Sequence, residues 1–166
     1  MSALPGLVPE EPTVAYDPDT GTVTVHGEGL PAVVLRRTGG RADDHTPVGT
    51  RDAARLALTV DGGAAGLTLP KGRLSRRSYR VDVRCDGGAY RLIPDSLATS
   101  RLLRDGRRLG SLTCDGDGRV TADWREGAKV LPLDVSLGYA LAAGFGTGAQ
   151  PMWVTAIDIG TDLLSP

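Results

Sequence analysis

The sequence predicts a mostly β fold, namely an antiparallel closed β-barrel of about 10–12 strands around a buried hydrophobic C-terminal helix. Two observations lead to this prediction. Short runs of alternating apolar and polar residues are separated by Asp-Gly turns, the strongest hairpin signal in a sequence. They are followed by one long apolar segment, Leu131–Trp153, in which Asp134 is the only charged residue. A content of 23 glycines and 11 prolines with 40% hydrophobic residues agrees with many short strands and turns.

The first part of the chain is expected to contain a flexible leader, a hairpin and a third strand. Residues 1–12 hold three prolines and show little periodicity, so we expect them to be extended or poorly ordered. The turn residues Asp17-Pro18-Asp19-Thr20-Gly21 lie between two strand-like runs. The predicted strands are Thr13–Tyr16, Thr22–His26 and Ala32–Arg37, and a long loop follows at Thr38–Asp52.

Two Asp-Gly-Gly turns, at residues 61–63 and 86–88, predict further hairpins. Alternation is clear in Tyr79–Arg84, where Tyr79, Val81 and Val83 form one apolar side of a half-buried strand. The strands predicted after the long loop are Arg55–Val60, Ala65–Leu69, Tyr79–Arg84, Tyr90–Ile93, Thr99–Leu103, Arg108–Thr113, Val120–Trp124 and Val154–Ile159.

A helix over about residues 132–145 would be apolar on nearly every side and must therefore be buried. Asp134 would offset the unpaired N–H groups at its N-terminal end, and Gly144, Gly146 and Gly148 would end it. Small residues such as Gly138 would allow strands to approach closely. Closing the sheet into a barrel would remove both exposed edges, with the helix filling the interior. The alternative is a helix packed across the open face of a sandwich.

Residues 13–166 are thus expected to form a single β-barrel domain. The order of strands, Arg101–Gly106, Leu109-Gly110, Trp124, an apolar helix and a last strand from Trp153 resembles the tubby C-terminal-like barrel superfamily. That superfamily includes the LURP-one-related proteins and the phospholipid scramblases. The resemblance implies a twelve-stranded barrel around a central helix, and binding of phosphoinositides or other phospholipids. It transfers no ligand residue to this chain, because no family ligand position is matched.

Charge is unevenly distributed along the chain. Residues 71–108 contain eleven basic and four acidic residues, whereas the remainder contains eight basic and sixteen acidic ones. Such a basic stripe can attract phosphate groups. The candidate anion-binding residues are Arg73, Arg76, Arg77, Arg80, Arg84, Arg101, Arg104, Arg107 and Arg108. The alternative explanation is that these arginines pair with carboxylates and only solvate the barrel.

We identify no catalytic residue, metal site or cofactor in the sequence. His26 and His45 are the only imidazoles, and neither lies in a nucleophile motif or at metal-ligand spacing. The run Asp115-Gly116-Asp117-Gly118 lacks the later ligands of a calcium loop and predicts a hairpin turn. Cys85 and Cys114 are expected to be free thiols.

The function predicted from the sequence is a non-enzymatic binding or scaffold module that binds anionic phospholipid headgroups through its arginine-rich surface. The alternative is a protein-interaction or assembly subunit that uses the same surface on an acidic protein partner. Sequence-specific nucleic-acid binding is not expected, because few aromatic residues are interleaved with the basic ones. We expect no transmembrane segment and a cytoplasmic location. The bias toward arginine over lysine is typical of GC-rich genomes, such as actinobacterial ones.

Overall fold

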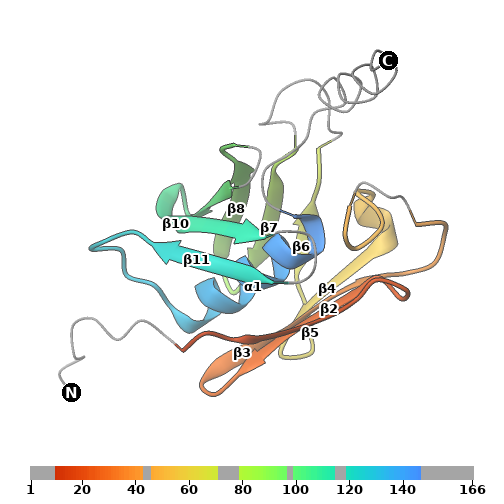
Figure 1. Cartoon of the computed structure of the whole chain (residues 1–166), viewed down its shortest axis with the longest axis horizontal. Coiled ribbons are helices and arrows are strands. Elements are labelled where there is room, and N and C mark those ends of the chain that lie inside the picture. Colours follow the sequence, from red (N-terminus) through yellow and green to blue (C-terminus); the bar gives the residue numbers. More distant parts are fainter. Residues whose placement is uncertain (1–9, 43–45, 71–78, 97–98, 115–118, 147–166) are drawn as a thin grey trace, which may run out of the picture.

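The computed structural model describes residues 10–42, 46–70, 79–96, 99–114 and 119–146. Within them the chain forms two antiparallel sheets with one α-helix packed against both (Figure 1). The first sheet contains β1 (Thr13–Asp17), β2 (Thr22–Gly27), β3 (Leu30–Arg37), β4 (Leu56–Val60) and β5 (Gly63–Ala64), with the 3-10 helix η1 (Ala53–Arg55) before β4. The second contains β6 (Gly66–Thr68), β7 (Val81–Cys85), β8 (Gly88–Pro94), β9 (Thr99–Arg104), β10 (Arg107–Cys114) and β11 (Val120–Trp124). The helix is α1 (Pro132–Phe145).

Strand order follows sequence order in both sheets, as β1-β2-β3-β4-β5 and β6-β7-β8-β9-β10-β11. Every described strand pair is antiparallel. The chain passes from the first sheet to the second at Ala65, whose N–H donates to the Leu58 carbonyl of β4 at 2.9 Å. The topology is therefore a meander that changes sheet once.

The prediction of a closed barrel is wrong, because neither sheet closes on itself within the described residues. There β1 pairs only with β2, and β11 pairs only with β10. Alternation along each strand shows which side is buried, but it carries no information on whether the first and last strands meet. The helix instead covers the inner faces of two separate sheets, which is nearer to the sandwich alternative. The strand predicted at Val154–Ile159 lies outside the described residues.

Tight Asp-Gly turns join β4 to β5, β7 to β8 and β9 to β10, as the sequence predicts. Asp61, Asp86 and Asp105 have φ angles of 48°, 48° and 50°, and the glycine after each also has a positive φ. Two consecutive residues with positive φ define the type I′ turn that suits twisted hairpins. Two of the carboxylates also tie the turn to a strand, since Asp61 accepts from the Ala32 N–H at 2.8 Å and Asp105 from the Ala89 N–H at 2.9 Å.

Helix α1 has the bounds that the sequence predicts and is buried along nearly its whole length. Pro132 occupies the first turn, where its missing N–H costs no hydrogen bond. The Asp134 carboxylate accepts from the Leu131 N–H at 2.7 Å, and Gly146, with φ 75°, follows the last helical residue. Because Leu137 and Leu141 are fully buried between the sheets, the helix supplies much of the core that each sheet lacks alone.

Two glycines of α1 permit close contact with both sheets. A Cβ at Gly138 would lie 3.0 Å from Leu102 Cδ2 of β9, and a Cβ at Gly144 would overlap Leu35 Cδ2 of β3. Helix and strands therefore approach more closely than a larger side chain would permit. This agrees with the expectation from the small residues in the helix sequence.

The described part of the loop between β3 and η1 is fixed against the first sheet and the end of α1. The Val48 N–H donates to the Gly144 carbonyl at 2.8 Å, and the Tyr16 hydroxyl donates to the Pro47 carbonyl at 2.6 Å. Arg37 Nη1 donates to the Val48 carbonyl at 2.9 Å. The two side-chain bonds satisfy loop carbonyl groups that lack a strand partner, and the backbone bond satisfies a carbonyl at the end of α1.

Candidate anion-binding surface

Arginines cover the outer side of the second sheet, which faces away from α1. In β7 the buried residues Val81 and Val83 alternate with Asp82 and Arg84, so the charged residues point outward. The same alternation and the strand register place the other arginines on this side. We call this surface the basic face, defined by Arg80, Arg84, Arg91, Arg101 and Arg108.

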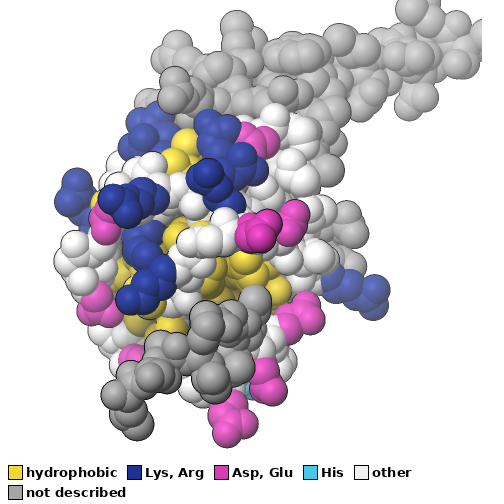
Figure 2. Space-filling view, turned by 90° about the vertical axis from the view of Figure 1, so that its left-hand side faces the viewer, with side chains coloured by type: hydrophobic (Ala, Val, Ile, Leu, Met, Phe, Trp, Pro, Cys, Tyr) yellow, Lys and Arg dark blue, Asp and Glu magenta, His cyan; other side chains and the backbone are white. Residues whose placement is uncertain are grey.

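Figure 2 shows the side of the molecule on which β8, β10 and β11 lie in Figure 1. Lysine and arginine side chains gather there around exposed hydrophobic side chains, and acidic side chains lie beside and below them. In the strand register, Leu103 of β9 lies between Arg91 of β8 and Arg108 of β10 and faces outward with them. Arginine side chains commonly rest their aliphatic portions on such residues and leave the guanidinium in water.

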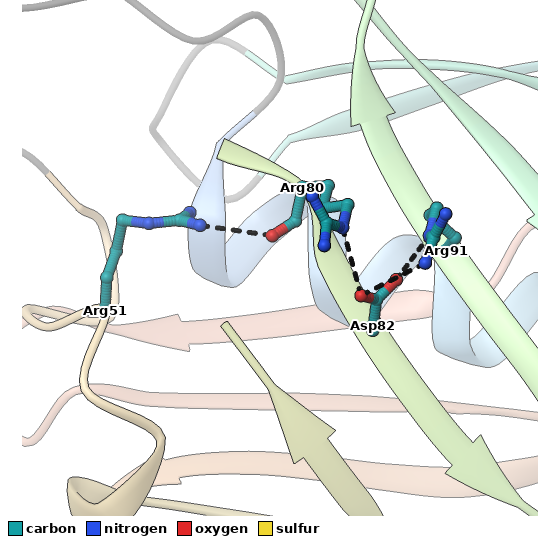
Figure 3. A network of polar contacts seen from close by, with 4 residues as sticks. All are labelled: Arg51, Arg80, Asp82 and Arg91. Carbon is teal, nitrogen blue, oxygen red and sulfur yellow. Dashed lines mark hydrogen bonds and ion pairs between the residues drawn. The ribbon is translucent and has the colours of Figure 1, made fainter. Parts of the chain in front are cut away.

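One aspartate of the basic face is shared by two arginines (Figure 3). Asp82 Oδ1 accepts from Arg91 Nε at 2.6 Å, and Asp82 Oδ2 accepts from Arg80 Nε at 3.2 Å. Asp82 and Arg91 lie directly opposite each other in the β7–β8 register, and Arg80 precedes β7 on the same side. Both carboxylate oxygens are thus engaged, while most guanidinium N–H groups of the two arginines have no partner among the described residues.

A second aspartate repeats this arrangement beside β9 and β10. Asp95 Oδ1 accepts a hydrogen bond from Arg101 Nη1, and Asp95 Oδ2 lies 3.8 Å from Arg108 Nη2. Arg108 also donates to the Ser111 hydroxyl at 2.7 Å. The basic face therefore holds two groups in which one carboxylate is placed against two guanidinium groups.

The basic face keeps an excess of positive charge after these pairs are counted. Its five arginines are matched by Asp82 and Asp95, which leaves a formal charge of +3, or +2 when the outward Asp123 of the edge strand β11 is included. Arg84 is exposed and has no ionic partner among the described residues. Because these arginines lie on or next to the strands of one sheet, their charges act together on an approaching anion.

The structure places the predicted site residues in different environments. Arg80, Arg84, Arg101 and Arg108 lie on the basic face, and Arg107 is exposed at the start of β10. The predicted residues Arg73, Arg76 and Arg77 lie outside the described residues.

Arg104 differs from the other predicted anion-binding residues, because its side chain is directed toward the inside of the protein. Arg104 shares the inner side of the sheet with Leu102, and its guanidinium donates to Asp134 Oδ2 at the start of α1. Tyr90, opposite Arg104 in the register, donates its hydroxyl to Asp134 Oδ1 at 2.8 Å. Asp134 is completely buried, so Arg104 serves to neutralise an internal carboxylate.

Electrostatic effects agree with this structural role. Burial, and then the hydrogen bond to Asp134, raise the pKa of the Tyr90 phenol above its ordinary value. The hydrogen bond to Asp134 likewise raises the pKa of the Arg104 guanidinium. Both groups therefore keep their protons more firmly in the folded protein, and this cluster holds the helix against β8 and β9.

Sequence reasoning did not include Arg91 among the site residues, although a signal for it exists. The two-residue turn at Asp86-Gly87 fixes the register of β7 and β8, which places Arg91 opposite Asp82. Alternation also indicated the inward position of Arg104, two residues after the buried Leu102.

Sequence reasoning also missed Arg51 as a residue that supports the basic face, because Arg51 lies in the long loop. Its guanidinium carbon lies 5.4 Å from the centre of the Tyr79 ring and 5.9 Å from that of Phe145. Arg51 Nη2 donates to the Arg80 carbonyl at 3.2 Å (Figure 3). The loop, the end of α1 and the approach to β7 thus meet at one arginine, which positions the first residue of the basic face.

The described residues contain no group of three or more histidine, cysteine or carboxylate side chains arranged to hold a metal ion. Cys85 and Cys114 are not joined to each other by a disulfide, and burial raises the pKa of the Cys85 thiol. His26 is exposed on β2, and His45 lies outside the described residues.

Comparison of the chain with protein families, curated proteins and solved structures found no match. The resemblance to the tubby C-terminal-like superfamily therefore stays a prediction. In the described part of the chain, no helix combines the length and the hydropathy required of a membrane span.

Proposed function

We propose that this chain is a non-enzymatic binding module that attaches to anionic phospholipid surfaces through the basic face. The observation that carries the proposal is the excess of arginine on one side of a single sheet, where Asp82 and Asp95 offset only part of the charge. Anionic membrane surfaces attract clusters of basic residues, at about 1 kcal/mol for each lysine or arginine near the surface.

The arrangement suits a surface better than a pocket. The arginines extend across β7–β10 and do not converge on one point, so several can contact separate headgroups at once. Arginine presents planar pairs of N–H donors that fit phosphate oxygens. The outward Leu103 adds apolar surface between two of the arginines.

The test is co-sedimentation of the purified protein with phosphatidylcholine vesicles, with and without phosphatidylserine. We expect binding to the anionic vesicles at low ionic strength and loss of binding at high ionic strength. The Debye length falls from about 30 Å at 0.01 M to about 3 Å at 1 M salt, which screens exposed charges.

Two matched variants locate the binding surface. Arg84→Ala removes an exposed arginine without an ionic partner from the basic face, and Arg36→Ala removes an exposed arginine from β3 of the other sheet. We expect Arg84→Ala to weaken vesicle binding about fivefold, since about 1 kcal/mol is lost with one arginine. Arg36→Ala should change binding by less than about twofold, because its charge lies on a different sheet.

Absence of binding to anionic vesicles at low ionic strength would overturn the lipid proposal. Recovery of a stoichiometric acidic protein with the wild type, but not with Arg84→Ala, would assign the basic face to protein assembly instead. Equal effects of the two variants would show that net charge, and not this surface, drives vesicle binding.

A further inference from the structure

Asp82 occupies the place between Arg80 and Arg91 where an external anion would sit (Figure 3). Its two oxygens accept from both Nε atoms, and a third contact joins Asp82 Oδ2 to Arg91 Nη2 at 3.4 Å. Carboxylate and phosphate oxygens use the same guanidinium donors. An anion that binds this pair of arginines through the Nε atoms must therefore displace or share the aspartate.

We infer that Asp82 is an affinity-setting residue of the basic face, a built-in competitor that weakens the binding of external anions. This inference rests on the proposed function in that the same arginines form the binding surface. The ion pairs are half exposed, with Asp82 at 23% and Arg91 at 49% of side-chain exposure. Partly exposed ion pairs contribute little to stability, so replacing Asp82 should cost the fold little.

Asp95 forms a similar arrangement at the other end of the basic face. It accepts from Arg101 and lies 3.8 Å from Arg108 Nη2, so one carboxylate again faces two arginines. Arg108 keeps a second bond to Ser111, which orients the guanidinium without neutralising it. The two groups together contain four arginines and two aspartates, so half of the formal charge of these four arginines is offset.

The test compares Asp82→Asn with Glu28→Gln. Both substitutions remove one negative charge, but Glu28 is exposed in the turn between β2 and β3, on the other sheet. We measure the salt concentration at which each protein elutes from immobilised heparin, and the partitioning of each onto phosphatidylserine vesicles. Asp82→Asn should elute at higher salt than wild type and Glu28→Gln, and should bind vesicles about fivefold more tightly, as expected for one additional net positive charge at the surface.

Identical elution of Asp82→Asn and Glu28→Gln would overturn the inference. A shift on heparin without vesicle binding by any variant would support the role of Asp82 and overturn the lipid proposal. Vesicle binding by the wild type with no gain in Asp82→Asn would overturn the role of Asp82 alone. If Asp82→Asn unfolds at a lower temperature than the wild type, the same heparin and vesicle measurements are made on Asp95→Asn. The inference is then judged by whether Asp95→Asn binds more tightly than Glu28→Gln.

Discussion

Replacing Asp134 with alanine should be among the most damaging single changes to this fold. Asp134 is fully buried at the start of α1 and accepts hydrogen bonds from Tyr90, Arg104 and the Leu131 N–H. Its removal leaves the arginine without a counterion, the phenol without its acceptor and the helix without its N-terminal carboxylate. Each of these losses affects the contact between α1 and the second sheet.

The magnitude follows from the type of interaction that is broken. Removing one partner of a buried ion pair costs about 3–5 kcal/mol, because the remaining charge is stranded. Arg104 retains 23% side-chain exposure, so water partly compensates it and the lower part of that range applies. We therefore expect a loss of about 3 kcal/mol from a total stability of about 5–15 kcal/mol.

The assay is urea denaturation followed by circular dichroism, with Asp123→Ala as the control at an exposed position of β11. The control should change the free energy of unfolding by no more than about 0.5 kcal/mol. In a double-mutant cycle, Asp134→Ala and Tyr90→Phe should be non-additive because they share one hydrogen bond. A loss below about 1 kcal/mol in Asp134→Ala would refute the view that this carboxylate fastens the helix.

Two further predictions concern packing and alkaline pH. Gly110→Ala should lower the melting temperature, because the new Cβ would lie 2.5 Å from the Asp123 carbonyl oxygen of the neighbouring strand, and overpacking of this kind costs about 1–3 kcal/mol. An unchanged melting temperature would show that β10 and β11 can separate there without cost. Since the pKa of Tyr90 is raised in the folded protein, its contribution to stability is complete below the unfolded pKa of about 10 and is lost as the pH rises above that value. As the pH is raised above about 10, the denaturation midpoint should fall more steeply for the wild type than for Tyr90→Phe. An equal dependence on pH in the two proteins would contradict a raised Tyr90 pKa in the folded state.

The local elements of this protein could be predicted well from its sequence. The pairs Asp61-Gly62, Asp86-Gly87 and Asp105-Gly106 each predicted a hairpin, because few residues other than glycine, asparagine and aspartate adopt positive φ. The helix was predictable because an apolar segment with one acidic residue at its start is typical of a buried helix. Its position over residues 132–145 depends only on neighbouring residues in the sequence.

The arrangement of the sheets could not be predicted in the same way. Barrel closure depends on contact between strands far apart in the chain, and no local pattern distinguishes it from an open pair of sheets. The predicted strand Ala65–Leu69 corresponds to β6 in the second sheet, whereas the two residues just before it form β5 in the first sheet. Residues 62–66 are all glycine or alanine, so they show little alternation of apolar and polar side chains. The sequence pattern therefore does not indicate this change of sheet.

The candidate site shows the same limit. The excess of arginine was evident from composition, whereas the role of each arginine depended on which side of its strand it occupies. Arg101 and Arg104 are three residues apart in β9 and therefore point to opposite sides, one toward Asp95 and the other toward Asp134. A count of charges treats these two residues as equivalent, although the structure gives them different partners.

The meander of strands followed by a single helix also affects how the chain must be made. Ribosomes synthesise the N-terminal part first, so the first sheet leaves the exit tunnel before α1 does. Until then, side chains such as Val33 and Leu112, which are fully buried in the native protein, have no helix against which to pack. The interval between the emergence of the first sheet and that of α1 is thus the one in which these apolar side chains are most exposed to aggregation.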